Sequence, residues 1–321
     1  MDEPRNAPRY LALSGGVGGA KLVFGLTQVL PPEALVVAVN VGDDFEHLGL
    51  TICPDLDTVL YTLSGRVHAE QGWGRADESW CVRDELQRLG GDTWFALGDR
   101  DIALHLLRRQ LLGQGLTLNA VSIELAHRLG VTITVLPVSD DRLRTMVDTD
   151  HGRLTFQDYF VRLRCEPAIR SLEFQGAASA ALAPGVRAVL ESPDLAGVIL
   201  CPSNPYLSMA PMLALTELRE RLRALTVPVI AVSPIVAGQA IKGPTAKIMR
   251  ELGVQPTAGV IADLYADFVD AVIVDTADAA LAAADARLVA APTVMKSAEQ
   301  KAALARSCIT LLEALRSNSG F

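Results

Sequence analysis

The stretch Leu13–Leu22, LSGGVGGAKL, places four glycines within five residues, between a short apolar run and a helical pattern. It has neither the G-K-[ST] ending of a nucleotide-hydrolase loop nor the G-x-G-x-x-G spacing of a dinucleotide fold. Glycine lets the backbone approach a ligand closely, and the amides at the start of a helix attract anions. We therefore expect this loop to bind a diphosphate, although a tight turn without a ligand is the alternative. The expected contacts are Gly15, Gly16, Gly18, Gly19 and Lys21.

Short apolar runs rich in Val, Ile and Leu recur along the chain, each followed by a polar cluster and a helical pattern. This order predicts βαβ units, and consecutive apolar residues suit parallel strands that are covered on both faces. We predict an α/β fold with a Rossmann-like, three-layer, mostly parallel sheet. The predicted strands are Tyr10–Leu13, Leu35–Val39, Trp94–Leu97, Val131–Leu136, Gly197–Cys201, Val227–Val232 and Ala271–Val274. The predicted helices include Lys21–Val29, Asp101–Leu112, Leu118–Leu129, Pro211–Ala224 and Ser297–Leu315.

One segment, at about residues 142–190, interrupts this order. Two stretches of alternating polarity flank Asp148–Gly152, which predicts a β-hairpin, and the pattern of Pro167–Val189 is helical. We expect a small subdomain of a β-hairpin and helices, inserted in a single domain that spans residues 1–321.

Composition limits the possible classes of function. The 321 residues are 50% hydrophobic and carry a net charge of −8, which disfavours binding to nucleic acid or to an anionic membrane. The first ten residues lack the apolar core of a signal peptide, and no run approaches the roughly 20 apolar residues of a membrane helix. The five cysteines lack the spacing of a zinc site. We expect a cytoplasmic protein.

Polar loops follow the predicted strands, and in a parallel sheet such loops meet at the carboxyl edge, where ligands bind. Carboxylates there suit Mg²⁺, which uses one or two protein ligands together with phosphates and water. The candidates are Asp43, Asp44, Asp55 and Asp57. We expect Asp57 to face the cleft and Asp55 to cap the following helix or face away. Helix capping or solvent exposure is the alternative for any one of these aspartates.

Two further loops carry candidate binding groups. GDRD places Asp99 and Arg100 at a predicted strand end, where the Arg100 guanidinium would suit a carboxylate or a phosphate. PSNP offers the Ser203 hydroxyl and the Asn204 amide to a nucleobase or a sugar. An ordinary turn is the alternative for this loop.

A series of motifs in this order resembles the 2-phospho-L-lactate transferases of coenzyme F-420 biosynthesis. The motifs extend from about residue 10 to residue 250 and read SGGVGGAKL, NVGDD, ICPDLDTVLYTL, GDRD, LPVSDD, FQDYFV, PSNP and VSPI. The resemblance implies an enzyme that transfers a phospholactate, phosphoenolpyruvate or phosphoglycerate group from a guanosine-diphosphate donor. The acceptor would be the ribityl hydroxyl of Fo, the deazaflavin 7,8-didemethyl-8-hydroxy-5-deazariboflavin, and GMP would leave. The resemblance also implies a homodimer.

The same resemblance implies roles for residues in the matching motifs. These are Asp43, Asp44 and Asp57 for Mg²⁺ or the Fo hydroxyl; Asp44, Asp57 and Arg100 for catalysis; and Gly15, Gly16, Gly18, Gly19, Lys21, Asp55, Asp99, Ser203 and Asn204 for substrate binding.

Two other functions compete with this transferase. A sister group of regulatory proteins that bind UDP-sugars has a similar glycine loop but lacks the motifs found here at Pro54–Asp57 and Pro202–Pro205. A nicotinamide-dependent dehydrogenase would need a different glycine spacing, although Asp43 and Asp44 partly imitate its ribose-binding carboxylate.

Overall fold

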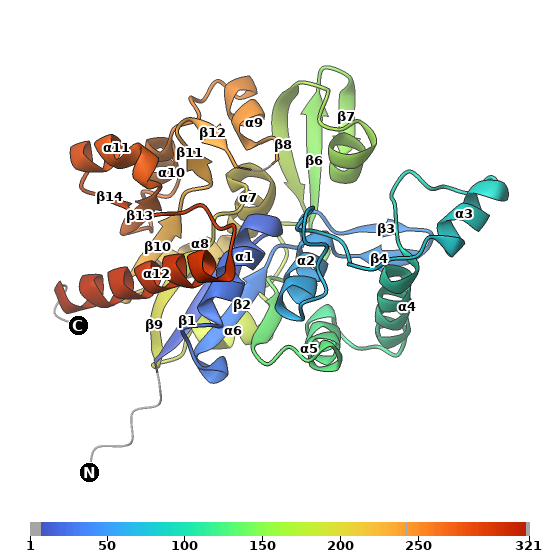
Figure 1. Ribbon diagram of the computed structural model, residues 1–321, viewed down its shortest axis with the longest axis horizontal. Coiled ribbons are helices and arrows are strands. Elements are labelled where there is room, and N and C mark those ends of the chain that lie inside the picture. Colours follow the sequence, from blue (N-terminus) through green and yellow to red (C-terminus); the bar gives the residue numbers. More distant parts are fainter. Residues whose placement is uncertain (1–7, 242, 319–321) are drawn as a thin grey trace, which may run out of the picture.

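The computed structural model describes residues 8–241 and 243–318, and seven parallel strands form its central sheet in the order β14-β13-β10-β9-β1-β2-β5 (Figure 1). Nearly all side chains of these strands are buried, because both faces of the sheet are covered. The strands are β1 Arg9–Ser14, β2 Leu35–Val39, β5 Thr134–Pro137, β9 Leu195–Leu200, β10 Val229–Val232, β13 Ala271–Val274 and β14 Leu288–Ala290. The predicted α/β fold with a mostly parallel sheet is confirmed.

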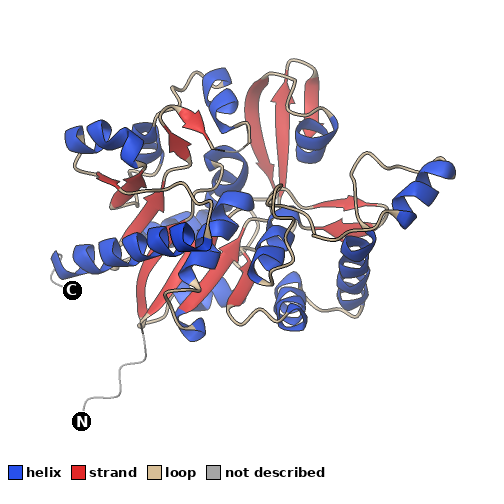
Figure 2. Ribbon diagram, viewed as in Figure 1, coloured by secondary structure: helices blue, strands red, loops and turns tan. Residues whose placement is uncertain are grey.

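Helices cover both faces of the sheet and make a three-layer structure (Figure 2). One face carries α1 Val17–Leu26, α2 Pro54–Leu63, α4 Asp99–Gly113, α5 Leu118–Leu129 and α12 Ala298–Asn318. The other face carries α6 Pro184–Leu190, α7 Ala210–Leu213, α8 Thr216–Ala224 and α10 Ala258–Leu264. Shorter elements are β11 Ile235–Val236, β12 Gln239–Ala240, α9 Thr245–Glu251 and α11 Ala279–Ala284.

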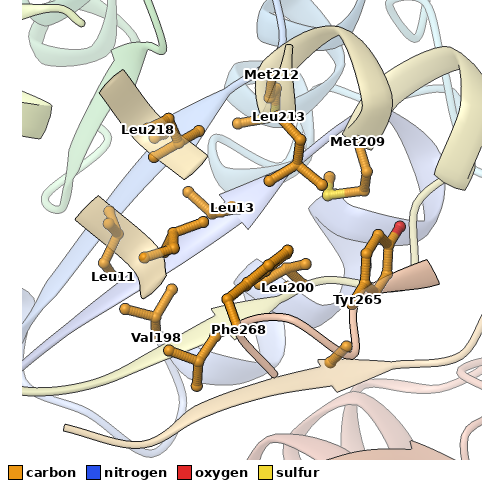
Figure 3. Packing of buried hydrophobic residues seen from close by; sticks show 14 of the residues in the cluster. Leu11, Leu13, Val198, Leu200, Met209, Met212, Leu213, Leu218, Tyr265 and Phe268 are labelled. Atoms are coloured by element: carbon orange, nitrogen blue, oxygen red, sulfur yellow. The ribbon is translucent and has the colours of Figure 1, made fainter. Parts of the chain in front are cut away.

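The core consists of two layers because successive strand residues point to opposite faces. In β1, Leu11 and Leu13 belong to one buried cluster, whereas Tyr10 and Ala12 belong to the other. Figure 3 shows Leu11 and Leu13 packed among side chains of the first cluster. β1 therefore contributes side chains to both layers of the core.

Three smaller sheets accompany the central sheet, and two of them, besides the β11–β12 pair, extend from the edge where its strands end (Figure 1). The first is an antiparallel hairpin of β3 Phe45–His47 and β4 Leu50–Ile52. The second has three antiparallel strands, β6 Arg144–Thr149, β7 Gly152–Thr155 and β8 Ile169–Gln175. The hairpin predicted around Asp148–Gly152 is therefore confirmed.

Two predictions of secondary structure are wrong. Residues 169–175 of the expected helical stretch form β8, in which Leu172 and Phe174 alternate with polar neighbours, and only α6 is helical there. Trp94–Leu97 is not a strand. These residues instead pack against the β3–β4 hairpin, where Phe95 and Leu97 join a small apolar cluster with Leu50 and Ile52.

Within residues 8–241 and 243–318, none of the helices combines the length and apolar character that crossing a membrane requires. The expectation about a signal peptide concerns mainly residues 1–7, which lie outside the described residues.

Candidate active site

The carboxyl ends of β1 and β9 form the centre of the candidate site. The chain passes from β1 to β2 on one side and later returns to β9 on the other side, so the strand order reverses between β1 and β9. Ligands of open α/β sheets bind at such a reversal. The loops after the two strands are in contact there, because the Gly15 amide donates to the Ser203 hydroxyl at 2.9 Å.

The glycine loop is packed too closely for side chains. Gly16 precedes α1, and Gly18 and Gly19 lie in its first turn. A Cβ atom on Gly18 would overlap the Pro202 carbonyl oxygen, and one on Gly16 would lie 2.5 Å from an Asp55 carboxylate oxygen. In the described part of the chain no side chain caps α1. The first-turn amides are therefore placed to bind an anion, and diphosphate binding stays a prediction.

Asn40, at the end of β2, connects two carboxylates. Its amide oxygen accepts from the Gly42 backbone N–H at 2.8 Å, which orients the side chain. Its amide nitrogen donates to Asp43 at 3.1 Å and to Asp55 at 3.0 Å. Asp55 also accepts from the Gly16 amide. The Asn40 side chain thus links the loop after β2 to the start of α2, and Asp55 links both of them to the glycine loop.

Negative charge is concentrated and poorly solvated at this point. Burial, and next the Asp55 charge, raise the pKa of Asp43 well above its ordinary value. Burial raises the pKa of Asp55 to about 6 and that of Asp44 to about 8. Among the described residues, one Asp44 carboxylate oxygen is buried without a hydrogen-bond partner. A cation would stabilise the ionised form of all three groups.

The Asp43 and Asp55 pair fits a magnesium ion that is shared with a substrate. No group of three or more His, Cys, Asp or Glu in residues 8–241 and 243–318 could hold a metal ion. Mg²⁺, however, commonly takes only one or two protein carboxylates and completes its shell with phosphate oxygens and water. Two close carboxylates beside a row of helix amides match that arrangement.

The expected orientations of Asp55 and Asp57 are wrong. Asp55 turns toward the glycine loop and accepts from the Ser208 hydroxyl and the Gly16 amide. Asp57 points the other way, and both of its oxygens accept from the guanidinium of Arg108, one of them at 3.0 Å. The physical reason is that α2 begins at Pro54, so residues 55 and 57 are separated by about 200° around the helix axis.

The expected placement of the GDRD loop at the sheet edge is also wrong, because no central strand precedes it. Asp99 accepts from the Ser79 hydroxyl at 2.6 Å and from the Cys81 and Val82 amides, each at 3.0 Å. It therefore caps α3 Cys81–Arg88. Arg100 is exposed in the first turn of α4. Figure 1 shows α3 and α4 beside the β3–β4 hairpin, away from the loops of β9 and β10.

The PSNP loop combines a contact with the glycine loop and a structural turn. Ser203 is buried and accepts from the Gly15 amide. The Asn204 amide oxygen accepts from the Tyr206 and Leu207 amides at 2.9 and 3.0 Å, so it caps the following turn. Lys21 is half-buried in α1, which leads away from the glycine loop.

The three-stranded insertion is anchored to the carboxylate loop. The Thr145 amide donates to the Gly42 carbonyl at 2.8 Å, and the Gln157 side-chain amide donates to the Asp43 carbonyl at 3.0 Å. Gln157 is buried and belongs to the FQDYFV motif. The insertion therefore supports the backbone that presents Asp43.

An aromatic cluster lies next to the carboxylates along the chain. The Phe45 and Phe95 rings meet edge to face at 4.8 Å, and the His47 and Trp94 rings do so at 5.4 Å. The Arg162 guanidinium of the insertion lies 4.4 Å from the centre of the Trp94 ring. The cluster thus joins the β3–β4 hairpin to the insertion.

Sequence reasoning missed four residues of this site. Asn40 and Gln157 lie inside the NVGDD and FQDYFV motifs, but the sequence prediction assigned the binding roles to aspartates and glycines instead. Ser208 and Arg108 lie on helical segments whose proximity to α2 only the fold shows. An arginine between apolar helix positions was the one available signal for Arg108.

The chain is similar to known proteins over most of its length. The family described as 2-phospho-L-lactate transferase CofD matches residues 11–310. A phosphoenolpyruvate transferase of Kitasatospora aureofaciens is 40% identical over 97% of this chain and 100% of its own length. A 2-phospho-L-lactate transferase of Methanococcoides burtonii is 38% identical over 84% of this chain and 86% of its own.

A solved structure of similar fold is that of a UPF0052 family member from Bacillus halodurans. It superposes with a TM-score of 0.62, at 15% identity, and the match covers 95% of this chain and 99% of that chain. At this identity the likeness concerns the fold alone.

Proposed function

Because the chain belongs to the 2-phospho-L-lactate transferase CofD family, we propose that it transfers a phosphorylated three-carbon acid from a guanosine-diphosphate donor to the ribityl hydroxyl of Fo. The protein is an enzyme of the transferase class. In the proposed reaction the hydroxyl oxygen attacks the phosphorus that carries the acid, the bond from this phosphorus to the bridging oxygen breaks so that GMP leaves with that oxygen, and the hydroxyl proton passes to water. The product is a phosphodiester and serves deazaflavin coenzyme biosynthesis.

The observation that carries this proposal is the contact between the glycine loop and the carboxylate pair. The Gly16 amide and the Asn40 side chain both donate to Asp55, and Asn40 also donates to Asp43. A diphosphate on the α1 amides would therefore lie beside Asp43 and Asp55. These two aspartates would hold Mg²⁺, which would neutralise the diphosphate charge that an acidic chain otherwise repels.

We assign the acceptor hydroxyl to Asp44. Its buried, unpartnered carboxylate oxygen is suited to accept a hydrogen bond from the hydroxyl and to orient it for attack. Phe45 follows directly in the chain and begins the aromatic cluster, whose partly exposed rings suit the flat deazaflavin ring by stacking. Catalysis then depends chiefly on positioning and charge neutralisation.

The resemblance also assigned catalysis to Asp57 and Arg100. The geometry favours supporting roles for them, because Asp57 is engaged by Arg108 and Arg100 lies at the start of α4. For the donor we favour the enolpyruvyl form, since a phosphoenolpyruvate transferase is matched over its full length. A soluble, cytoplasmic homodimer remains part of the proposal.

The test supplies the protein with Fo, GTP, a guanylyltransferase and one acid phosphate at a time, and determines the mass of the product. We expect a phosphodiester of Fo from phosphoenolpyruvate and loss of turnover when EDTA removes Mg²⁺. Formation of no adduct with phosphoenolpyruvate, 2-phospholactate or phosphoglycerate would overturn the proposed transfer. Full turnover in metal-free EDTA buffer would overturn the role of Mg²⁺.

A further inference from the structure

Arg108 is a fully buried arginine in the interior of α4. Its exposed fraction is 0%, and it lies on the same face of the helix as Leu104 and Leu111, which belong to the apolar core. A charged side chain is unusual in such surroundings. The guanidinium donates to both oxygens of Asp57 in α2 and to the Thr51 carbonyl in β4, the latter at 3.2 Å. One side chain thus connects three separate elements directly behind the candidate active site.

A second contact between the same helices lies one turn later in α2 and about two turns earlier in α4. Tyr61 of α2 donates to Asp101 of α4 at 2.5 Å, and His105 lies 3.4 Å from Asp101 and 3.1 Å from Arg108. These polar groups form a largely buried network of close contacts between α2 and α4, in which Asp101 is partly exposed. The network includes Asp101 of the GDRD motif, a motif to which the proposed reaction assigns no direct role.

The first turn of α2 is where this network meets the active site. Asp57 belongs to that turn and faces α4, whereas Asp55 belongs to the same turn and faces Asn40 and the glycine loop. Since a helical turn moves as a rigid unit, the contact of Asp57 with Arg108 determines where the Asp55 carboxylate lies. Within the described residues no side chain caps α2, so the turn is anchored by the contacts of Asp55 with Asn40 and the glycine loop on one side and by the contact of Asp57 with Arg108 on the other.

Stability alone does not account for such a pair. Removing an arginine and an aspartate from water is unfavourable, and apolar side chains of similar volume often replace a buried ion pair without loss of stability. A forked guanidinium–carboxylate contact instead provides a fixed geometry. Arg108 and Asp57 are therefore better explained by the position they enforce than by the energy they contribute.

We propose that Arg108 is a positioning residue, which acts through Asp57 to hold the Asp55 carboxylate against Asp43 and the glycine loop. This inference rests on the proposed function, in which Asp43 and Asp55 bind the metal ion that accompanies the diphosphate. Groups that orient metal ligands in this way typically change metal affinity by about 10–100-fold when they are replaced.

The test measures binding of Mn²⁺ in the presence of GDP, by the electron paramagnetic resonance signal of free Mn²⁺. Arg108→Lys keeps the charge but loses the forked contact, and we expect the dissociation constant of Mn²⁺ to rise by about 10-fold or more. Arg187→Lys is the matched control, because Arg187 makes a similar forked contact with Glu217 between α6 and α8. We expect Mn²⁺ affinity to stay within about twofold of wild type in this control.

A second variant, Asp57→Asn/Arg108→Met, removes both charges, so that neither charge is left buried without its partner. Circular dichroism checks that each variant is folded at the temperature of the titration. Wild-type Mn²⁺ affinity in folded Arg108→Lys overturns the inference, whether or not the double variant folds. A wild-type protein that binds no Mn²⁺ with GDP would instead overturn the proposed function, and this inference with it.

Discussion

Asp55 and Asp57 lie two residues apart on α2, but their electrostatic surroundings are opposite. Asp55 is half-buried near Asp43, and its charge raises the pKa of that residue. Asp57 is paired with Arg108, which is itself fully buried. In the metal-free protein, loss of the Asp55 charge removes a repulsion, whereas loss of the Asp57 charge leaves a buried guanidinium without its partner.

We therefore predict stability changes of opposite sign for two chemically identical substitutions. Asp57→Asn should lower the free energy of unfolding by about 3–5 kcal/mol, because it breaks a buried ion pair. Asp55→Asn should leave this free energy unchanged or raise it, while it weakens Mg²⁺-dependent turnover. Urea unfolding in EDTA measures both changes, and a larger destabilisation by Asp55→Asn would contradict the orientation of the two side chains.

At the level of single elements, α3 depends on its cap. None of its residues is buried, so apolar packing contributes little to it. The Ser79 hydroxyl and the first-turn amides at Val82 and Cys81 donate to Asp99, and these hydrogen bonds lower the pKa of Asp99 below the ordinary value of 3.8. Because the folded-state pKa is the lower one, the cap stabilises α3 above about pH 3.8 and is lost as the pH falls through the folded-state pKa.

We predict that Asp99→Ala destabilises α3 locally and leaves GDP binding unchanged. Hydrogen exchange of the amides in residues 81–88 should accelerate several-fold at neutral pH, because an N-cap is lost. Asp92→Ala, at an exposed carboxylate in the loop after α3, is the control and should leave this exchange unchanged. A fall in GDP affinity with unchanged exchange would show that Asp99 binds the donor instead.

Secondary structure was predictable for the fully buried strands of the central sheet. Leu35–Val39 and Ala271–Val274 were predicted with the bounds they have, because fully buried parallel strands are apolar at every position. The run Trp94–Leu97 has the same apolar character but packs as an irregular aromatic segment against Phe45. A short apolar run indicates that a segment is buried, but it does not show whether the segment is a strand or an irregular loop.

For the molecule as a whole, the sequence predicts that polar loops gather at the carboxyl edge but does not predict which loops touch. That β9 lies beside β1, and so brings Ser203 to Gly15, depends on strand order. The orientation of Asp55 likewise depends on Arg108, 51 residues beyond Asp57, which no local pattern can supply. Motifs therefore identified the loops of the site, and only tertiary packing decides the roles within them.

The contact between the loops of β1 and β9 leads to a final prediction for Gly18→Ala. A Cβ atom at Gly18 would overlap the Pro202 carbonyl oxygen, so the loops must separate at the point where the strand order reverses. Crowding of this kind typically costs about 1–3 kcal/mol, which exceeds the gain of up to about 1 kcal/mol from replacing glycine in a helix. We expect a lower melting temperature together with weaker GDP binding, measured by calorimetry, because the α1 amides shift with the loop.

Gly113→Ala in α4, where nothing lies within 4 Å of the new Cβ, should keep GDP affinity and match or exceed wild-type stability. Unchanged stability and GDP affinity in Gly18→Ala would show that the two loops are not a tightly packed seat for the diphosphate.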